Sequence, residues 1–162
     1  MAFRLHETLR MLRMMFVMLA FAQTDKASLS PVEEASSAAL QRGDYQKVMA
    51  LSEQGLAADP NDAWLLYDRG AAMASLGRLD EAVTTLARAE ATFRADQPWG
   101  RALAAYRRGL ALARLGRCNE AQVALTKYAT LMKQLDRDVA VDSERGVAQC
   151  ERQNVGGRSK QQ

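Results

Sequence analysis

Apolar and polar residues follow a helical period almost without interruption from residue 31 to residue 135. Apolar side chains recur three or four positions apart, and short stretches rich in Gly, Asp, Asn and Pro break the pattern. Ala and Leu supply most of the apolar positions, whereas strand-favouring β-branched residues are sparse. The pattern therefore predicts an all-α fold. The expected helices span residues 31–42, 45–58, 62–76, 79–95, 99–115 and 118–135, with a seventh over 139–152.

A glycine followed by a polar residue recurs at three of the breaks between predicted helices. Gly43 and Gly77 are 34 residues apart, and Gly77 and Gly116 are 39 apart. The additional residues of the second interval fit an insertion at 96–100. A glycine in this position can end a helix by adopting a positive φ without steric cost. The spacing therefore predicts three copies of a hairpin of two helices joined by a short turn.

The repeating unit resembles the tetratricopeptide repeat family over residues 29–135. The three copies span 29–62, 63–96 and 102–135, and the second copy is the best match, followed by the third. The first copy departs most, at Val48, Ser52 and Gly55. Besides the turn glycines, the resemblance depends on a small residue in the first helix of each copy, and on a small position and a bulky position, four residues apart, in the second helix. These are Ser36, Gly70 and Gly109, then Val48, Ala82 and Ala121, then Ser52, Leu86 and Leu125.

The resemblance implies a right-handed α-solenoid of three helix hairpins, in which each hairpin packs only on its neighbours. The small residues Gly70 and Gly109 are expected to let the second helix of a hairpin approach the first closely. The seventh predicted helix, 139–152, would be a C-terminal capping helix that covers the apolar edge of the last hairpin.

The first 22 residues have the features of an export signal. Three arginines precede an uncharged apolar run over 14–21, and Ala20, Phe21 and Ala22 form an A-x-A cleavage site. The run is shorter than the roughly 20 residues that a membrane-spanning helix needs. We therefore expect an exported bacterial protein, periplasmic or secreted, without stable membrane insertion after cleavage. The alternative is an uncleaved segment that tethers the protein to the inner membrane.

These features predict the division of the chain. Residues 23–29 are polar and follow the predicted cleavage site, and the last nine residues contain a Gly pair and no apolar periodicity. We expect a signal peptide over 1–22, a polar leader over 23–29, a repeat domain with its capping helix over 30–153 and a disordered tail over 154–162.

Charge and composition exclude several classes of function. The full chain has a net charge of +3, but residues 1–22 hold three arginines and one glutamate, which leaves +1 on the predicted mature chain. Such a chain lacks the concentrated basic surface that nucleic-acid binding requires. The one histidine, His6, lies in the predicted signal peptide, so no histidine-based catalytic pair or metal site remains. We expect no enzymatic activity, no cofactor and no metal.

Cys118 and Cys150 are the two cysteines of the chain, and both lie in the predicted mature part. In an oxidising compartment an even number of cysteines favours a disulfide. The register of the repeats puts both residues on the same edge of the solenoid, where a bond would join the capping helix to the third repeat. The alternative is two buried thiols that serve as small core residues.

The resemblance also implies that the first helix of each repeat lines a concave groove for a partner. The residues predicted there include aromatic and arginine side chains, which anchor many interfaces. They are Trp64, Tyr67, Tyr106, Arg107, Leu110 and Arg114. The alternative is that Trp64 and Tyr67 only cover the seam between the first two repeats.

Some family members grip a terminal carboxylate in this groove with Lys, Asn and Arg. The corresponding places here hold Glu33, Ser37, Asp68, Leu103 and Arg107. Only Arg107 suits that chemistry, so recognition of that kind is not expected.

Together these features predict a non-catalytic protein–protein interaction scaffold of the cell envelope, which binds a peptide or helix in its concave groove. The partner is expected to be a protein or peptide. The alternative is a structural subunit that forms homo-oligomers through its repeat edges. The polar residues Ser36, Ser37 and Ser52 of the first repeat would suit an edge that a neighbouring copy completes.

Overall fold

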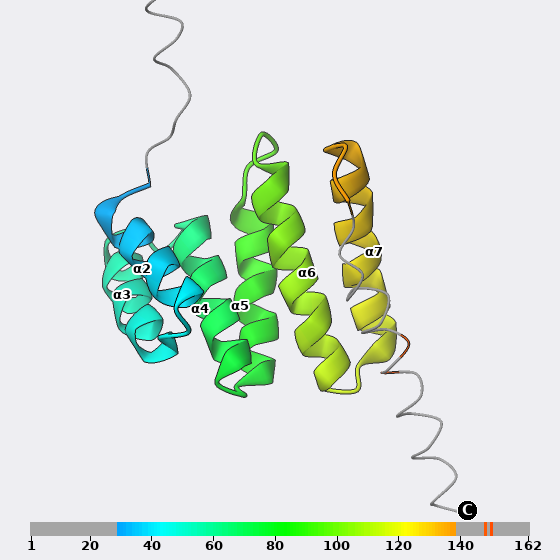
Figure 1. Ribbon diagram of the computed structural model, residues 1–162, viewed down its shortest axis with the longest axis horizontal. Helices are drawn as coiled ribbons and strands as arrows, with labels where there is room; N and C mark the ends of the chain where they lie inside the picture. Colours follow the sequence, from blue (N-terminus) through cyan, green and yellow to red (C-terminus); the bar gives the residue numbers. More distant parts are fainter. Residues whose placement is uncertain (1–28, 139–147, 149, 151–162) are drawn as a thin grey trace, which may run out of the picture.

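Six helices make up the part of the chain that the computed structural model describes, which is residues 29–138, 148 and 150 (Figure 1). No strand occurs among these residues, and none of their helices is long and apolar enough to cross a membrane. The all-α prediction is confirmed, and each of the six expected helices begins within one residue of the observed one. They are α2 (Pro31–Gln41), α3 (Tyr45–Ala58), α4 (Ala63–Ser75), α5 (Leu79–Thr92), α6 (Pro98–Arg114) and α7 (Cys118–Gln134).

Several predicted segments lie outside the described residues. They are the signal peptide over 1–22, the leader up to residue 28 and the tail over 154–162. Most of the predicted capping helix also lies outside, although Ala148 and Cys150 are described and helical.

One helix ends three residues before its predicted limit, whereas the others end within one residue of theirs. α5 ends at Thr92, before the expected limit of residue 95, because Phe93 leaves the helical conformation with ψ 128°. The Phe93 ring packs against Trp64 on α4, so a contact with the other helix of the same repeat coincides with the end of α5.

The helices stack in chain order, and each packs against its neighbours along the sequence (Figure 1). α2 also contacts α4, and α4 contacts α6, whereas α3, α5 and α7, all within the described part, do not contact one another. The first helices of the three hairpins, α2, α4 and α6, therefore lie closer together than the second helices, and they form the inner side of the stack. The predicted α-solenoid of three hairpins is confirmed.

Side chains at the helix starts explain where the first three helices begin. Ser30 and Glu33 form a reciprocal capping box before α2, in which the Glu33 amide donates to Ser30 Oγ at 3.2 Å. Asp44 and Asp62 accept a backbone N–H at the starts of α3 and α4. The break between α3 and α4 therefore ends in a capping residue, Asp62.

The three turn glycines take the conformation that the sequence predicted. Gly43, Gly77 and Gly116 have φ values of 76°, 82° and 74°, in the left-handed region where a side chain is strained. Each lets the chain reverse directly after the first helix of its hairpin, so that the second helix returns alongside the first.

Within the second and third hairpins, a glycine of the first helix faces a leucine of the second. A Cβ atom added at Gly70 would lie 2.6 Å from Leu86 Cγ, and one added at Gly109 would lie 2.6 Å from Leu125 Cγ. Both leucines are buried. The prediction that these glycines permit a close approach of the two helices is confirmed, because the interior has no room for another methyl group.

The first hairpin reaches similar packing with a different pair of residues. Ser36 stands in the place of Gly70 and Ser52 in the place of Leu86, and both serines are fully buried. A larger residue on one helix is thus offset by a smaller one on the other, which conserves the volume of the core. The interpretation of Ser36 and Ser52 as part of an exposed edge is wrong, since both lie inside the hairpin.

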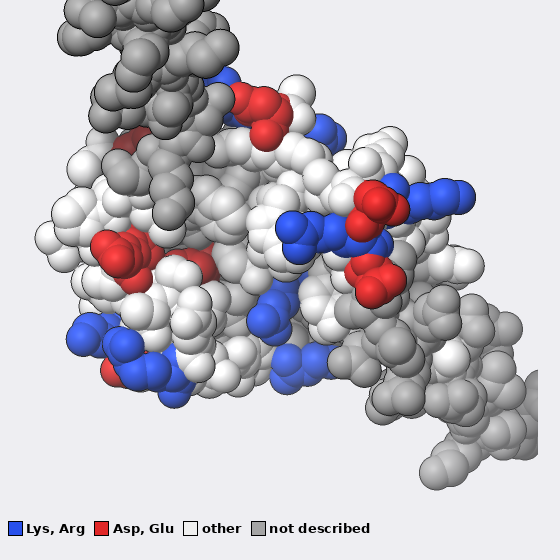
Figure 2. Space-filling model, turned by 45° about the horizontal axis from the view of Figure 1, so that its top comes forward, with Lys and Arg blue, Asp and Glu red and all other residues white. Residues whose placement is uncertain are grey.

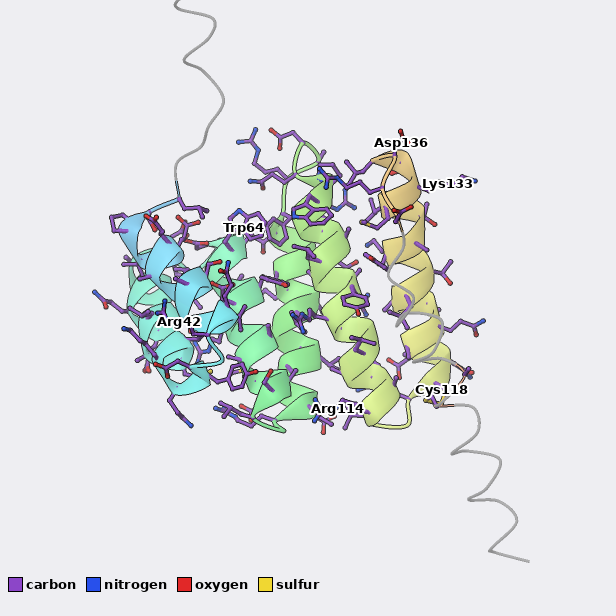
Figure 3. The ribbon with its side chains drawn as sticks, viewed as in Figure 1. Arg42, Trp64, Arg114, Cys118, Lys133 and Asp136 are labelled. Carbon is purple, nitrogen blue, oxygen red and sulfur yellow. A yellow bond between two sulfur atoms is a disulfide. The ribbon has the colours of Figure 1, made fainter. Side chains whose placement is uncertain are left out.

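Cys118 begins α7 (Figure 3), and Cys150 lies beside it with its Cα atom 5.6 Å away and the two sulfur atoms at bonding distance. This Cα separation is typical of protein disulfides. Both side chains are buried in an apolar cluster that includes Ala111 and Leu112. The geometry is compatible with the predicted bond, and its chemical formation stays a prediction.

Candidate functional site

A groove of about 560 Å³ opens on the inner side of the stack, between α2, α4 and α6. Figure 2 shows acidic and basic side chains in separate clusters on one face of the molecule. The lining comes from these three helices and from the residue before the capping box. It consists of Leu29, Glu33, Ser37, Leu40, Gln41, Trp64, Tyr67, Asp68, Trp99, Leu103 and Arg107.

Aromatic side chains form much of the floor of the groove. Trp64 packs edge-on against Phe93, with ring centroids 4.9 Å apart, and also meets the ring of Tyr67. Trp99, in the first turn of α6, is 41% exposed and is the most accessible aromatic residue of the lining. The Arg137 guanidinium lies over this ring, 5.2 Å from its centroid, and the part of the ring that stays exposed beside the hollow suits the apolar side chain of a partner. Trp64 and Tyr67 line the groove and also lie in an apolar cluster with Leu40 and Leu56 of the first repeat, so the two alternatives are compatible in position.

Asp68 on α4 is a buried carboxyl group in the wall of the groove. It is 3% exposed, and no ion pair joins it to any residue of the described part of the chain. Burial, together with the negative charges of Asp62 and Glu33, raises the pKa of Asp68 to about 6. The buried Ser36 hydroxyl offsets part of this rise, although it forms no hydrogen bond of normal geometry. Asp68 is therefore an acid without a counter-charge among the described residues.

Glu33 places a second carboxylate in the same wall. It is half-buried on α2, and its Oε2 atom accepts the Ser30 amide in the capping box, which fixes the side chain. Arg107 lines the groove from α6, is exposed, and forms no ion pair with another described residue. The groove therefore has an acidic wall on α2 and α4 and a basic residue on α6.

Half of the residues predicted for the groove line it: Trp64, Tyr67 and Arg107. The other three lie elsewhere on α6. The ring of Tyr106 lies 4.9 Å from that of Tyr128 on α7. Arg114 donates to the carbonyl oxygen of Ala74 at 2.7 Å and lies toward the opposite end of the helices from Trp64 (Figure 3). Leu110 is half-buried and is not part of the lining.

Trp99 was not predicted to line the groove. The sequence placed it at the end of an insertion, whereas in the structure it follows Pro98 in the first turn of α6. Proline in the first turn is a helix-start signal. Trp99, Leu103 and Arg107 are spaced four residues apart and therefore lie on one face of α6. The predicted helix over 99–115 already contained Trp99, and its four-residue spacing to Leu103 and Arg107 is the signal that would have added it to the predicted groove.

A buried ion-pair network joins the last three helices. Glu90 on α5 has a side chain that is only 6% exposed. Its Oε2 atom accepts from Arg108 on α6, at 2.9 Å from Nη2 and 3.0 Å from Nε, and its Oε1 atom pairs with Lys127 on α7. This carboxylate therefore has its charge balanced from two neighbouring helices.

Replacing Glu90 by alanine is expected to lower the free energy of unfolding by about 2 kcal/mol, because it leaves the mostly buried Arg108 cation without its anion. The loss is moderate because both cations keep some contact with water. Urea unfolding followed by helical circular dichroism measures the difference. Glu81→Ala, which removes an exposed partner of Arg78, is the matched control. Equal losses in both variants would contradict the role of Glu90 as a buried link.

Comparisons with known proteins agree with this architecture. Residues 39–106 match the family model for the tetratricopeptide repeat. Among solved structures, the chain is similar to the first TPR of Spaghetti (RPAP3) bound to HSP90 peptide SRMEEVD. The TM-score is 0.62 and the identity 18%, over 76% of this chain and 90% of that chain. No curated protein matches the sequence. Both matches confirm the resemblance to the tetratricopeptide repeat that the sequence indicated, with the family model covering residues 39–106.

Proposed function

We propose that this chain is a non-catalytic interaction module that binds a peptide or helical segment of a protein in the groove between α2, α4 and α6. Its tetratricopeptide-repeat fold supports protein–protein interaction in general. The observation that carries the narrower proposal is the groove itself. It combines the exposed ring of Trp99 with charged groups, Asp68 and Arg107, that have no ion-pair partner among the described residues. Aromatic and arginine side chains are the groups that dominate binding at protein interfaces.

The solved relative adds support to the choice of a peptide as ligand. Its repeat domain is bound to a peptide. The groove described here has a volume of about 560 Å³, which falls within the range of sites that enclose small ligands or a few side chains. Tetratricopeptide-repeat proteins generally act as scaffolds, which favours binding over catalysis.

Photo-crosslinking in the native cell tests this proposal. A photoreactive amino acid at Gln41, which is exposed on the lining of the groove, is expected to give discrete crosslinked products. The same amino acid at Gln122, exposed on α7 and outside the groove, is the matched control and should give none of them. Identical products from both sites, or none from Gln41, would contradict a binding role for the groove.

We also propose that the protein is exported and acts in the cell envelope after losing residues 1–22. The basic segment, the short apolar run and the A-x-A site support this. N-terminal sequencing of protein recovered outside the cytoplasm is expected to begin at Gln23. A chain that begins at Met1 in the membrane fraction would instead support the tethered alternative.

A further inference from the structure

We infer that the groove selects a peptide segment with a basic side chain beside an apolar one, and that Glu33 and Asp68 bind the basic group. The inference rests on the proposed function and adds the chemical class of the partner. The aromatic floor of the groove would contact the apolar neighbour.

Asp68 provides the main argument, because it differs from the other buried acid of the molecule. Glu90 is paired with two cations from neighbouring helices. Asp68 is just as buried, yet it lacks an ion pair within the described residues and lines the groove. A buried carboxylate without a partner lowers the stability of the fold. Its place in the groove wall is the place where a cation of a bound partner would supply the missing charge.

Glu33 adds a second negative charge that the fold already holds in position. Its Oε2 atom is fixed by the Ser30 amide, and the other carboxylate oxygen has no protein donor among the described residues. Glu33 lies near enough to Asp68 for its charge to act on that carboxyl group. A cation bound at this wall would relieve the repulsion between the two acids.

The surroundings favour the side chain of lysine or arginine over a metal ion. The described residues contain no group of three or more His, Cys, Asp or Glu side chains arranged to hold a metal, and hard divalent cations take more oxygen ligands than two carboxylates offer. Trp64, Tyr67 and Asp68 are spaced three and four residues apart on α4 and line the same groove. Aromatic rings beside a carboxylate suit both the methylene stem and the charged end of a basic side chain.

The opposite wall sets the expected orientation of the segment. Arg107 projects a positive charge into the groove from α6 and would repel a second basic group there. The basic side chain is therefore expected on the α2 side, with its apolar neighbour against Trp99 and Leu103.

An array of short synthetic peptides tests the inference. Each peptide carries one leucine or tryptophan and two variable positions at different spacings. Three series of peptides place lysine, glutamine or glutamate at the variable positions. At about 0.15 M salt, which screens long-range attraction, we expect the full chain to retain the lysine series at least about tenfold better than the other two. The chain has a net charge of +3, so overall charge alone would favour glutamate.

Two isosteric variants assign the effect to the acidic wall. Glu33→Gln and Asp68→Asn are each expected to reduce the retention of the lysine series to that of the glutamine series. Glutamine at position 33 keeps the capping box, so α2 should remain folded, and circular dichroism checks this. Glu34→Gln removes an exposed charge next in sequence but outside the groove lining, and it is expected to keep the preference for lysine.

Three results would overturn the inference. One is equal retention of the lysine and glutamine series, which would leave groove binding itself intact. Another is stronger retention of the glutamate series, including SRMEEVD, the peptide of the solved relative. The third is no retention of any peptide, and crosslinking from Gln41 then decides whether the proposed function fails as well.

Discussion

Reduction of a bond between Cys118 and Cys150 is expected to lower the free energy of unfolding by about 3–4 kcal/mol. The two residues are 32 positions apart, and a cross-link over a loop of this length lowers the entropy of the unfolded chain by about that amount in free energy. The bond would also hold Cys150 against α7, in a cluster built largely from small side chains such as Ala111 and Ala121. Small side chains bury little apolar area, so this contact depends strongly on the covalent link.

The bond and its effect can be measured separately. Thiol titration of the denatured, unreduced protein is expected to find no free thiol after export to an oxidising compartment. Urea unfolding with and without reductant then gives the loss of stability. The double variant Cys118→Ala, Cys150→Ala should unfold like the reduced protein and should not respond to reductant. Two free thiols, or an unfolding midpoint that reduction leaves unchanged, would support the alternative of two buried thiols.

The fold can be predicted from the sequence because its determinants are local. Capping residues such as Ser30 and Asp62 start helices, and glycines such as Gly43 end them, within a few residues of the signal. The end of α5 departs from the prediction because the Phe93 ring packs against residues of other helices, Trp64 of α4 and Gly100 of α6. The Phe93 ring occupies the space beside Gly100, where an added Cβ atom would lie 2.4 Å away. No pattern within α5 itself reveals that contact.

The groove can be predicted only in part, because neighbouring positions on a helix point in different directions. Tyr106 and Arg107 are adjacent in sequence, yet one packs on α7 and the other lines the groove, as the turn of about 100° per residue allows. The burial of Asp68 and Glu90 also could not be predicted from the sequence. An acid within an amphipathic helix is normally on the solvated face, and only the packing of neighbouring helices shows that these two are not.

Replacing Asp68 by asparagine is expected to raise the free energy of unfolding near neutral pH by about 2–3 kcal/mol. Burial raises the pKa of Asp68 from 3.8 to about 6. Between these values the folded chain holds a proton that the unfolded chain has released, so the contribution of Asp68 to stability falls as the pH rises from about 4 to about 6. Asparagine has nearly the same shape without the charge, and its side-chain amide can still interact with the Ser36 hydroxyl.

The pH dependence isolates this residue from its surroundings. The charged groups that face Asp68 are Glu33 from α2, Asp62 at the start of α4 and, across the groove, Arg107 from α6. All three are unchanged in the variant, so the difference between variant and parent reports Asp68 alone. We expect this difference to disappear below about pH 4, where Asp68 is protonated in both the folded and the unfolded chain. Asp80→Asn, at an exposed site, is the matched control and should change little.

Whether Asp68→Asn raises or lowers the free energy of unfolding indicates what role the Asp68 carboxylate has in the protein. A variant no more stable than its parent at neutral pH would mean that Asp68 has a partner within the folded chain, and the argument for a cation from outside would lose its support. A more stable variant that also loses its preference for lysine peptides would fit a site that keeps a destabilising charge for binding. The paired Glu90 gives the reference, since an acid in the same fold whose charge is balanced internally should destabilise the protein when it is removed.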